Sequence, residues 1–181
     1  MQRTIYRVLL SLLFTVSLIS CDQGASLQSY FVNNQETPNF ISVDIPTSFV
    51  NIDKTTLSEE QIEAYESVNK LNMLGYNLTE NNIAEYEAEL SKVKSILRAD
   101  KYEELMTGGN ASLGHFTIKY IGSDTSIDEL IIFGSSKENG FAIVRVLGDD
   151  MEPAKLMTLG SALENVTSEE NSVADFMKFF N

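Results

Sequence analysis

The sequence is short of cysteine, histidine and tryptophan, and it has half as many basic as acidic residues. Its 181 residues include one Cys, one His and no Trp, with 13 basic against 26 acidic side chains and a formal net charge of −13. One Cys excludes an internal disulfide framework and a cysteine-rich zinc site, and one His excludes His-rich metal centres. The negative balance argues against nucleic-acid binding, which needs a basic surface to displace counterions. We therefore expect no metal, no cofactor and no nucleic-acid partner.

The first twenty residues have the anatomy of a secretory signal peptide. Arg3 and Arg7 form a positive n-region, and residues 8–19 form an apolar run interrupted only by small hydroxyl residues. This run is shorter than the roughly twenty residues that a membrane-spanning helix needs. Residues 1–20 are thus predicted to be a signal peptide that is removed from the mature protein.

The end of this run resembles a bacterial lipobox, because residues 18–21 read Leu-Ile-Ser-Cys. The resemblance implies cleavage between Ser20 and Cys21, a diacylglycerol on the thiol of Cys21 and an acyl chain such as palmitate on its freed amine. The alternative is a leftover thiol in an ordinary secretory signal, but no Ala-x-Ala-like cleavage site lies nearby. Each buried CH₂ contributes about 0.8 kcal/mol, so two or three chains would form a permanent membrane anchor.

The acyl chains, rather than surface charge, are expected to hold the protein at the membrane. Residues 1–20 contain two Arg and no acidic residue, so the mature chain would carry a net charge of −15 and be repelled by anionic headgroups. Residues 21–26 form a short lipidated tether, which places the domain close to the membrane. Asp22 resembles an inner-membrane retention signal in some enteric bacteria but not in other lineages. We favour the outer membrane and leave its periplasmic or surface face open.

Two long helices are predicted within a single domain over residues 27–163. Apolar residues recur every three or four positions over residues 81–97, with Ile83 in the buried stripe and Glu89 outside it. Thr79 or Asn81 is the expected N-cap of this helix. Glu152-Pro153 begins the second helix, because Pro suits the first helical position. Two short helices are expected at 27–33 and 58–66.

The period of the apolar residues changes from about 3.6 to 2 between these helices, which predicts strands. Residues 130–133 are apolar on both faces and indicate a central strand, and Asn139-Gly140 is a strong hairpin signal. The fold class predicted is α+β, a two-layer sandwich with a largely antiparallel sheet and helices packed on one face. The expected strands cover residues 40–45, 68–76, 102–107, 116–120, 130–133 and 141–147.

Several of these segments resemble a family of Bacteroidetes lipoproteins known only as the domain of unknown function numbered 4252. The likeness covers roughly residues 27–163 and leaves out the stretch that follows. It implies a bacterial envelope lipoprotein and brings no catalytic residues, because the family has no assigned activity. The segments that carry the likeness are 40–46, 101–106, 116–120, 127–131 and 142–149.

Arg145 is a candidate partner or ligand contact. It shares strand parity with Phe141, Ile143 and Leu147, so its charge falls on an otherwise apolar face of a strand. One interpretation is an anion site or a partner contact. The interpretation that we favour is a structural pair with a neighbouring acidic residue.

The remaining polar residues do not form a catalytic motif. His115, the single imidazole, has no orienting partner or nucleophile that can be placed beside it, so we expect a surface or edge-strand histidine. Adjacent acidic residues do not share a face and are interpreted as solvated surface. The protein is therefore predicted not to be an enzyme. The acidic pairs are Glu59/Glu60, Glu103/Glu104, Asp149/Asp150 and Glu169/Glu170.

Residues 164–181 are predicted to be an acidic linker followed by a Phe-rich C-terminal helix. This helix would either dock on the sheet of its own domain or bind a partner through Phe176, Phe179 and Phe180. Its apolar face would consist of Val173, Phe176, Met177 and Phe180.

The function expected from the sequence is that of a bacterial cell-envelope lipoprotein acting as a non-enzymatic binding or adaptor domain for an unidentified envelope protein. One alternative is a carrier that holds a small apolar ligand between the sheet and the helices. The least favoured alternative is a carboxylate-dependent hydrolase, which requires acidic residues from distant parts of the chain to meet in a cleft.

Overall fold

Four α-helices, one short 3₁₀ turn and six strands make up the part of the chain that the computed structural model describes, residues 25–47, 54–110 and 114–163. The helices are α2 (Leu27–Asn34), α3 (Glu59–Ser67), α4 (Ile83–Ile96) and α5 (Pro153–Leu163), with the 3₁₀ turn at Lys54–Thr56. The strands are β1 (Phe40–Pro46), β2 (Val68–Asn77), β3 (Glu103–Asn110), β4 (Gly114–Gly122), β5 (Ile127–Ser136) and β6 (Gly140–Met151).

Local sequence signals set the starts of three helices. The Ser26 hydroxyl accepts from the Ser29 N–H at 3.2 Å, and the Ser29 hydroxyl accepts from the Ser26 N–H at 3.1 Å, which is a reciprocal capping box at α2. Ser58 and Gln61 form the same arrangement at α3. Helix α5 begins at Pro153 as predicted. These contacts satisfy backbone donors that have no partner within the helix.

The N-cap predicted for α4 is wrong. The helix follows Asn82, rather than Thr79 or Asn81, and the Asn82 side chain forms no hydrogen bond with the first turn. Its amide oxygen instead accepts from the backbone N–H of Thr79 at 2.8 Å. The polar residue before the helix therefore stabilises the preceding turn.

The buried stripe of α4 also differs from the prediction at two positions. Ile83 is 53 % exposed, and the first buried residue of the helix is Tyr86. Glu89, placed outside the stripe by the periodicity, is only 9 % exposed and accepts a hydrogen bond from the hydroxyl of Tyr30. A polar partner on α2 has overridden the apolar pattern at this position.

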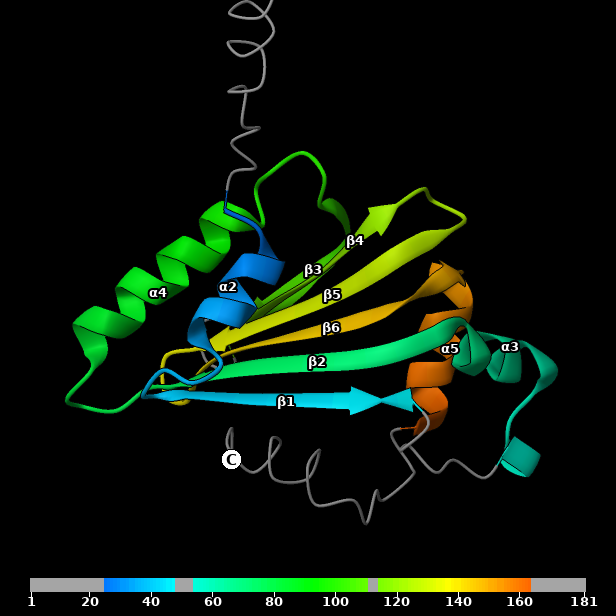
Figure 1. Cartoon of the computed structure of the whole chain (residues 1–181), viewed down its shortest axis with the longest axis horizontal. Helices are drawn as coiled ribbons and strands as arrows, with labels where there is room; N and C mark the ends of the chain where they lie inside the picture. The colour runs from blue at the N-terminus through cyan, green and yellow to red at the C-terminus, as the bar shows by residue number, and fades with distance from the viewer. Residues whose placement is uncertain (1–24, 48–53, 111–113, 164–181) are drawn as a thin grey trace, which may run out of the picture.

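The strands form one antiparallel sheet with the order β1-β2-β6-β5-β4-β3, which confirms the predicted sheet (Figure 1). Strands β3 to β6 are consecutive neighbours, whereas β2 pairs with β6 and β1 pairs with β2. Helix α4 carries the chain from β2 to the start of β3 at the far edge. Strands β1 and β3 are therefore the two edges of the sheet.

Helices α2 and α4 cover one face of the sheet, which we name the helix-covered face (Figure 1). Aromatic side chains fill the space between the two layers, and the rings of Tyr76 and Phe141 stack with centroids 5.5 Å apart. Phe40 meets the Tyr76 ring edge-on at 4.9 Å, and Tyr86 and Phe133 pack against Phe141. This layer confirms the α+β sandwich.

The other face of the sheet, which we name the second face, is covered at one end by α3 and α5. Leu130 and Val146 are paired across β5 and β6 and point away from α2 and α4. They belong to a separate core with Ala64, Leu156 and Leu159. The expectation of helices on a single face is thus incomplete, because α3 and α5 carry apolar stripes of their own that need a sheet surface.

Gly140 occupies a position that tolerates no other residue. It follows Asn139 with a φ of +118°, and a Cβ there would lie 1.9 Å from the carbonyl oxygen of Tyr76. We expect Gly140→Ala to lower the free energy of unfolding by about 1–3 kcal/mol in chemical denaturation. Gly160→Ala is the matched control, because a Cβ there meets nothing within 4 Å and Ala is favoured inside a helix by roughly 0.5–1 kcal/mol. Equal effects of the two substitutions would contradict this assignment.

Candidate functional site

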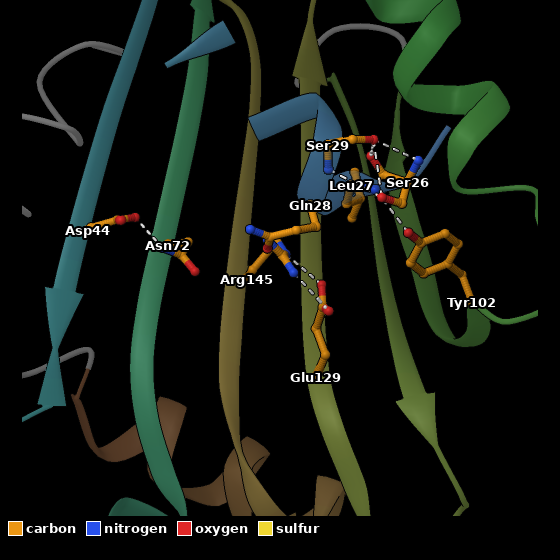
Figure 2. Close-up of polar contacts among 9 residues, drawn as sticks. All are labelled: Ser26, Leu27, Gln28, Ser29, Asp44, Asn72, Tyr102, Glu129 and Arg145. Carbon is orange, nitrogen blue, oxygen red and sulfur yellow. Dashed lines mark hydrogen bonds and ion pairs between the residues drawn. The ribbon is translucent and has the colours of Figure 1, made fainter. Parts of the chain in front are cut away.

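A row of polar side chains crosses the helix-covered face of four neighbouring strands. Asp44, Asn72 and Arg145 occupy paired positions on β1, β2 and β6, and Glu129 lies on the neighbouring strand β5. Figure 2 shows the Asn72 amide directed at Asp44, and the side chains of Arg145 and Glu129 directed at each other. Gln28 of α2 reaches the same guanidinium. The row places a complete ion pair inside an otherwise apolar layer.

Arg145 and Glu129 form a bidentate pair. The Arg145 Nε lies 2.6 Å from one carboxylate oxygen and its Nη2 lies 3.0 Å from the other. Its Nη1 donates to the Gln28 Oε1 at 2.7 Å, and the guanidinium carbon lies 5.1 Å from the centroid of the Phe31 ring. Arg145 is 4 % and Glu129 7 % exposed. The parallel hydrogen bonds compensate the desolvation of both charges.

This geometry decides between the two interpretations of Arg145. A guanidinium that is buried, paired with an internal carboxylate and covered by α2 offers no surface to a partner or an anion. The prediction of Arg145 as a partner contact is therefore corrected to a structural role, which is the interpretation favoured from the sequence. The sequence also marks Glu129, because it shares strand parity with Ile131 and Phe133 and so places a charge among apolar residues, as Arg145 does.

The first residues of the folded domain are fixed to its core. Leu27 is fully buried, and its backbone N–H donates to the hydroxyl of Tyr102 at 3.1 Å (Figure 2). Together with the capping box at Ser26 this contact holds the start of α2 in place. None of the helices in the described ranges combines the length and the hydropathy needed to cross a membrane.

A groove of about 860 Å³ lies between α2 and α4. Ser29 and Tyr30 line it from α2, and Lys92 and Ile96 line it from α4. The Tyr30 hydroxyl donates to Glu89 at 2.8 Å, and burial together with this carboxylate raises the pKa of Tyr30 above its ordinary value. Lys92 pairs with the same carboxylate. Tyr30 and Lys92, which line the groove from opposite helices, thus share the carboxylate of Glu89 as their polar partner.

Exposed apolar side chains gather at the β3 edge of the sheet. Leu105 and Met106 of β3 are 39 % and 44 % exposed, Phe116 of β4 is 38 % and Ile132 of β5 is 37 % exposed. Met106 and Ile132 both lie on the second face, because each is paired with Ile118 of the strand between them. We name Leu105, Met106, Phe116 and Ile132 the β3 patch.

The other polar candidates do not converge. His115 is exposed near the start of β4 and borders a cavity of about 170 Å³ together with Arg98 and Glu104. No carboxylate within the described residues hydrogen-bonds to this imidazole, so the orienting partner of a catalytic base is not found there. The acidic pairs at 59–60, 103–104 and 149–150 are exposed on α3, β3 and β6. Within the same residues, no group of three or more His, Cys, Asp or Glu could hold a metal ion.

The other predicted site residues lie outside the described residues. These are Ser20 and Cys21 of the lipobox-like sequence, the pair Glu169/Glu170, and Phe176, Phe179 and Phe180 of the C-terminal segment.

The chain is similar to one known protein family. One family model, described as a domain of unknown function (DUF4252), matches residues 30–159 and thus more than half of the chain. No curated protein and no solved structure matches it.

Proposed function

This chain belongs to the DUF4252 family of domains of unknown function, and for it we propose a role as a lipid-anchored adaptor of the bacterial cell envelope. In this proposal acylated Cys21 holds the domain at a membrane, with the outer membrane favoured. The domain binds an envelope protein there and catalyses no reaction. The β3 patch is the observation that carries the proposed binding role.

The lipid anchor is supported by the lipobox-like sequence and by the fixed start of the fold. Leu27 is buried and hydrogen-bonded, so a tether from Cys21 extends no further than this residue. Six residue steps separate Cys21 from Leu27, and a chain of this length spans at most about 20 Å. A domain held in this way stays at the membrane surface, where its partners are other envelope proteins.

The β3 patch combines an open sheet edge with exposed apolar side chains. An edge strand presents unpaired backbone N–H and C=O groups that an extended peptide can bind as an additional strand. The large exposed apolar residues of the described sheet lie on β3, β4 and β5, whereas the opposite edge strand β1 contributes none. The β3 edge is therefore the better docking surface of the two.

The charge at the β3 edge indicates the chemistry of its occupant. Glu103 and Glu104 are exposed at the first positions of β3, and the whole chain is strongly acidic. Glu104 is paired with Lys119 of β4 and borders a small cavity that Lys94 and Arg98 also line. Within the described residues, Glu103 is therefore the acidic residue with no such basic neighbours at this edge. Apolar side chains of an extended segment would contact the β3 patch, and basic residues beside them would pair with the two carboxylates. We therefore propose an extended apolar and basic segment of an envelope protein as the partner.

Site-specific photo-crosslinking in intact cells tests the proposed docking surface. A photoreactive residue at position Leu105 is expected to give a discrete adduct with one envelope protein. The matched control is position Ile83, which is 53 % exposed on α4 and lies away from the β3 edge. Equal adducts at both positions, or none at Leu105, would rule out the β3 edge as the binding surface.

Charge reversal tests the chemistry of the partner in the same assay. Glu103→Lys combined with Glu104→Lys should reduce the yield of the adduct several-fold, because basic residues of the partner would then be repelled. Glu59→Lys combined with Glu60→Lys is the matched control on α3 and should leave the yield unchanged. A yield that is insensitive to Glu103 and Glu104 would contradict a basic partner segment.

The alternatives from the sequence are less favoured. A carrier would need an apolar space between the sheet and the helices, where Tyr76, Phe141 and their aromatic neighbours are closely packed. The groove of about 860 Å³ between α2 and α4 is lined by polar side chains such as Ser29 and Lys92 as well as by apolar ones. A hydrolase would need acidic residues that meet in a cleft, whereas the described acidic pairs lie apart on separate elements. The adaptor role is the hypothesis that we retain.

A further inference from the structure

The part of the second face formed by β1, β2 and β6 carries an apolar cluster that no described helix joins. Its central residues, Ile45 and Met73, are only 5 % and 7 % exposed. The partly buried residues around them all come from the same three strands, and we name the whole set the β1–β6 cluster. Its other members are Ile41, Val43, Leu71, Ala142 and Val144.

This cluster needs a cover of its own. The helices α3 and α5 belong to a different core on this face, with Ala64, Leu156 and Leu159. Side chains of a single sheet layer shield one another only from the sides, so an apolar sheet face of this kind ordinarily packs against a second layer. Among the described residues, the β1–β6 cluster has members from these three strands alone and none from a second layer.

Helix α5, the last described element, ends on the side of the sheet that carries the β1–β6 cluster. Helix α5 packs on the second face, and Figure 1 shows it running from the end of β6 toward the end of β1. The chain therefore leaves Leu163 on the side of the sheet where the cluster lies. Eight residues, 164–171, follow before the Phe-rich segment, and they span up to about 26 Å when extended.

The C-terminal segment also has the length and composition to cover this cluster. A helix over residues 172–181 would be about 15 Å long, comparable to the run of β1 that carries Ile41, Val43 and Ile45. In such a helix the side chains on the opposite face include Asp175 and Lys178, which suits contact with water on the outside. The helix would carry its apolar face on Val173, Phe176, Met177 and Phe180.

We propose that Ser172–Asn181 docks as an amphipathic helix on the β1–β6 cluster and completes the second face of the domain. The helix occupies the β1 half of this face and leaves the β3 patch open. Phe176 and Phe180 then act within the fold instead of as contacts for another protein. This docking is independent of the proposed adaptor function, because it involves neither the membrane anchor nor the β3 edge.

The absence of Trp from the chain allows a direct test by fluorescence. Phe176→Trp is introduced into the full chain, which is purified from whichever cell fraction holds it and is measured in the presence of lipid vesicles. We expect emission at shorter wavelength than in denaturant and acrylamide quenching several-fold weaker than for the matched variant Lys178→Trp. Equal quenching of the two variants, or emission of Phe176→Trp at the denatured position, would overturn the docking.

A second substitution locates the docking surface. Ile41→Asp, placed on the edge strand β1 in the Phe176→Trp background, should shift the emission toward its denatured position while the far-ultraviolet circular dichroism stays unchanged. Ile83→Asp is the matched control on α4 and should leave the emission unchanged. Vesicles with brominated acyl chains test the alternative that this segment inserts into the membrane. Strong quenching of Phe176→Trp by these lipids would show membrane insertion and refute the proposal.

Discussion

Arg145→Ala is expected to lower the free energy of unfolding by about 3–5 kcal/mol, because it leaves the carboxylate of Glu129 buried without a counter-charge. Glu129 is 7 % exposed, and both of its oxygens accept from the guanidinium. Removal of the guanidinium also leaves Gln28 and the Phe31 ring without their contact beneath α2. Equilibrium denaturation in urea measures the change.

A double substitution separates the cost of an orphaned charge from the value of the pair. Arg145→Met combined with Glu129→Leu removes both charges and keeps a similar apolar volume, so its stability should return to within about 1–2 kcal/mol of the parent chain. A structural pair is contradicted if Arg145→Ala unfolds at the same urea concentration as the parent. The same result would return Arg145 to consideration as a binding residue.

Cys21→Ser is expected to release the protein from the membrane completely. Acyl chains contribute about 0.8 kcal/mol for each buried CH₂, and the acidic domain has no attraction to anionic headgroups that could replace them. Labelling with a palmitate analogue should be abolished by the substitution. Membrane fractionation and labelling of intact cells measure the two effects.

Ser20→Ala is the matched control for this prediction, because it keeps a small residue immediately before the cleavage site. Its membrane association and its labelling should equal those of the parent chain. Retention of Cys21→Ser in the membrane fraction with undiminished labelling would refute the lipid anchor. It would leave the crosslinking at Leu105 and the fluorescence of Phe176→Trp as independent tests of the fold and of its surfaces.

The sequence predicts a helix or strand correctly where a short stretch of residues carries a strong structural preference of its own. Strand β5 reads as apolar on both faces because it lies between two layers, and the Asn139-Gly140 turn marks the hairpin into β6. Pro153 marks the start of α5 because its missing N–H has no partner at a helix start in any case. These signals need no knowledge of the tertiary structure.

The sequence-based predictions are wrong where the burial of a residue depends on a partner that is distant in the sequence. Glu89 is buried because Tyr30, which is 59 positions away, donates to it, and no helical periodicity contains that information. The contact of Gln28 with Arg145 spans 117 positions and depends on how α2 lies across the sheet. By contrast, Arg145 and Glu129 each lie on an otherwise apolar face of their strand. The sequences of the two strands alone therefore indicate an internal ion pair.

The strand order has a consequence for how the chain folds. Strand β2 is synthesised early, yet its sheet neighbour β6 is the last strand, and their pairing joins positions as distant as Val68 and Gly148. Strands β3 to β6 can form a meander through short loops, whereas β1 and β2 gain their place only after β6 is in position. Such non-local pairing slows folding, because the chain must close a long loop before the contact forms. The N-terminal third, which carries the tether, is thus expected to join the sheet late in folding.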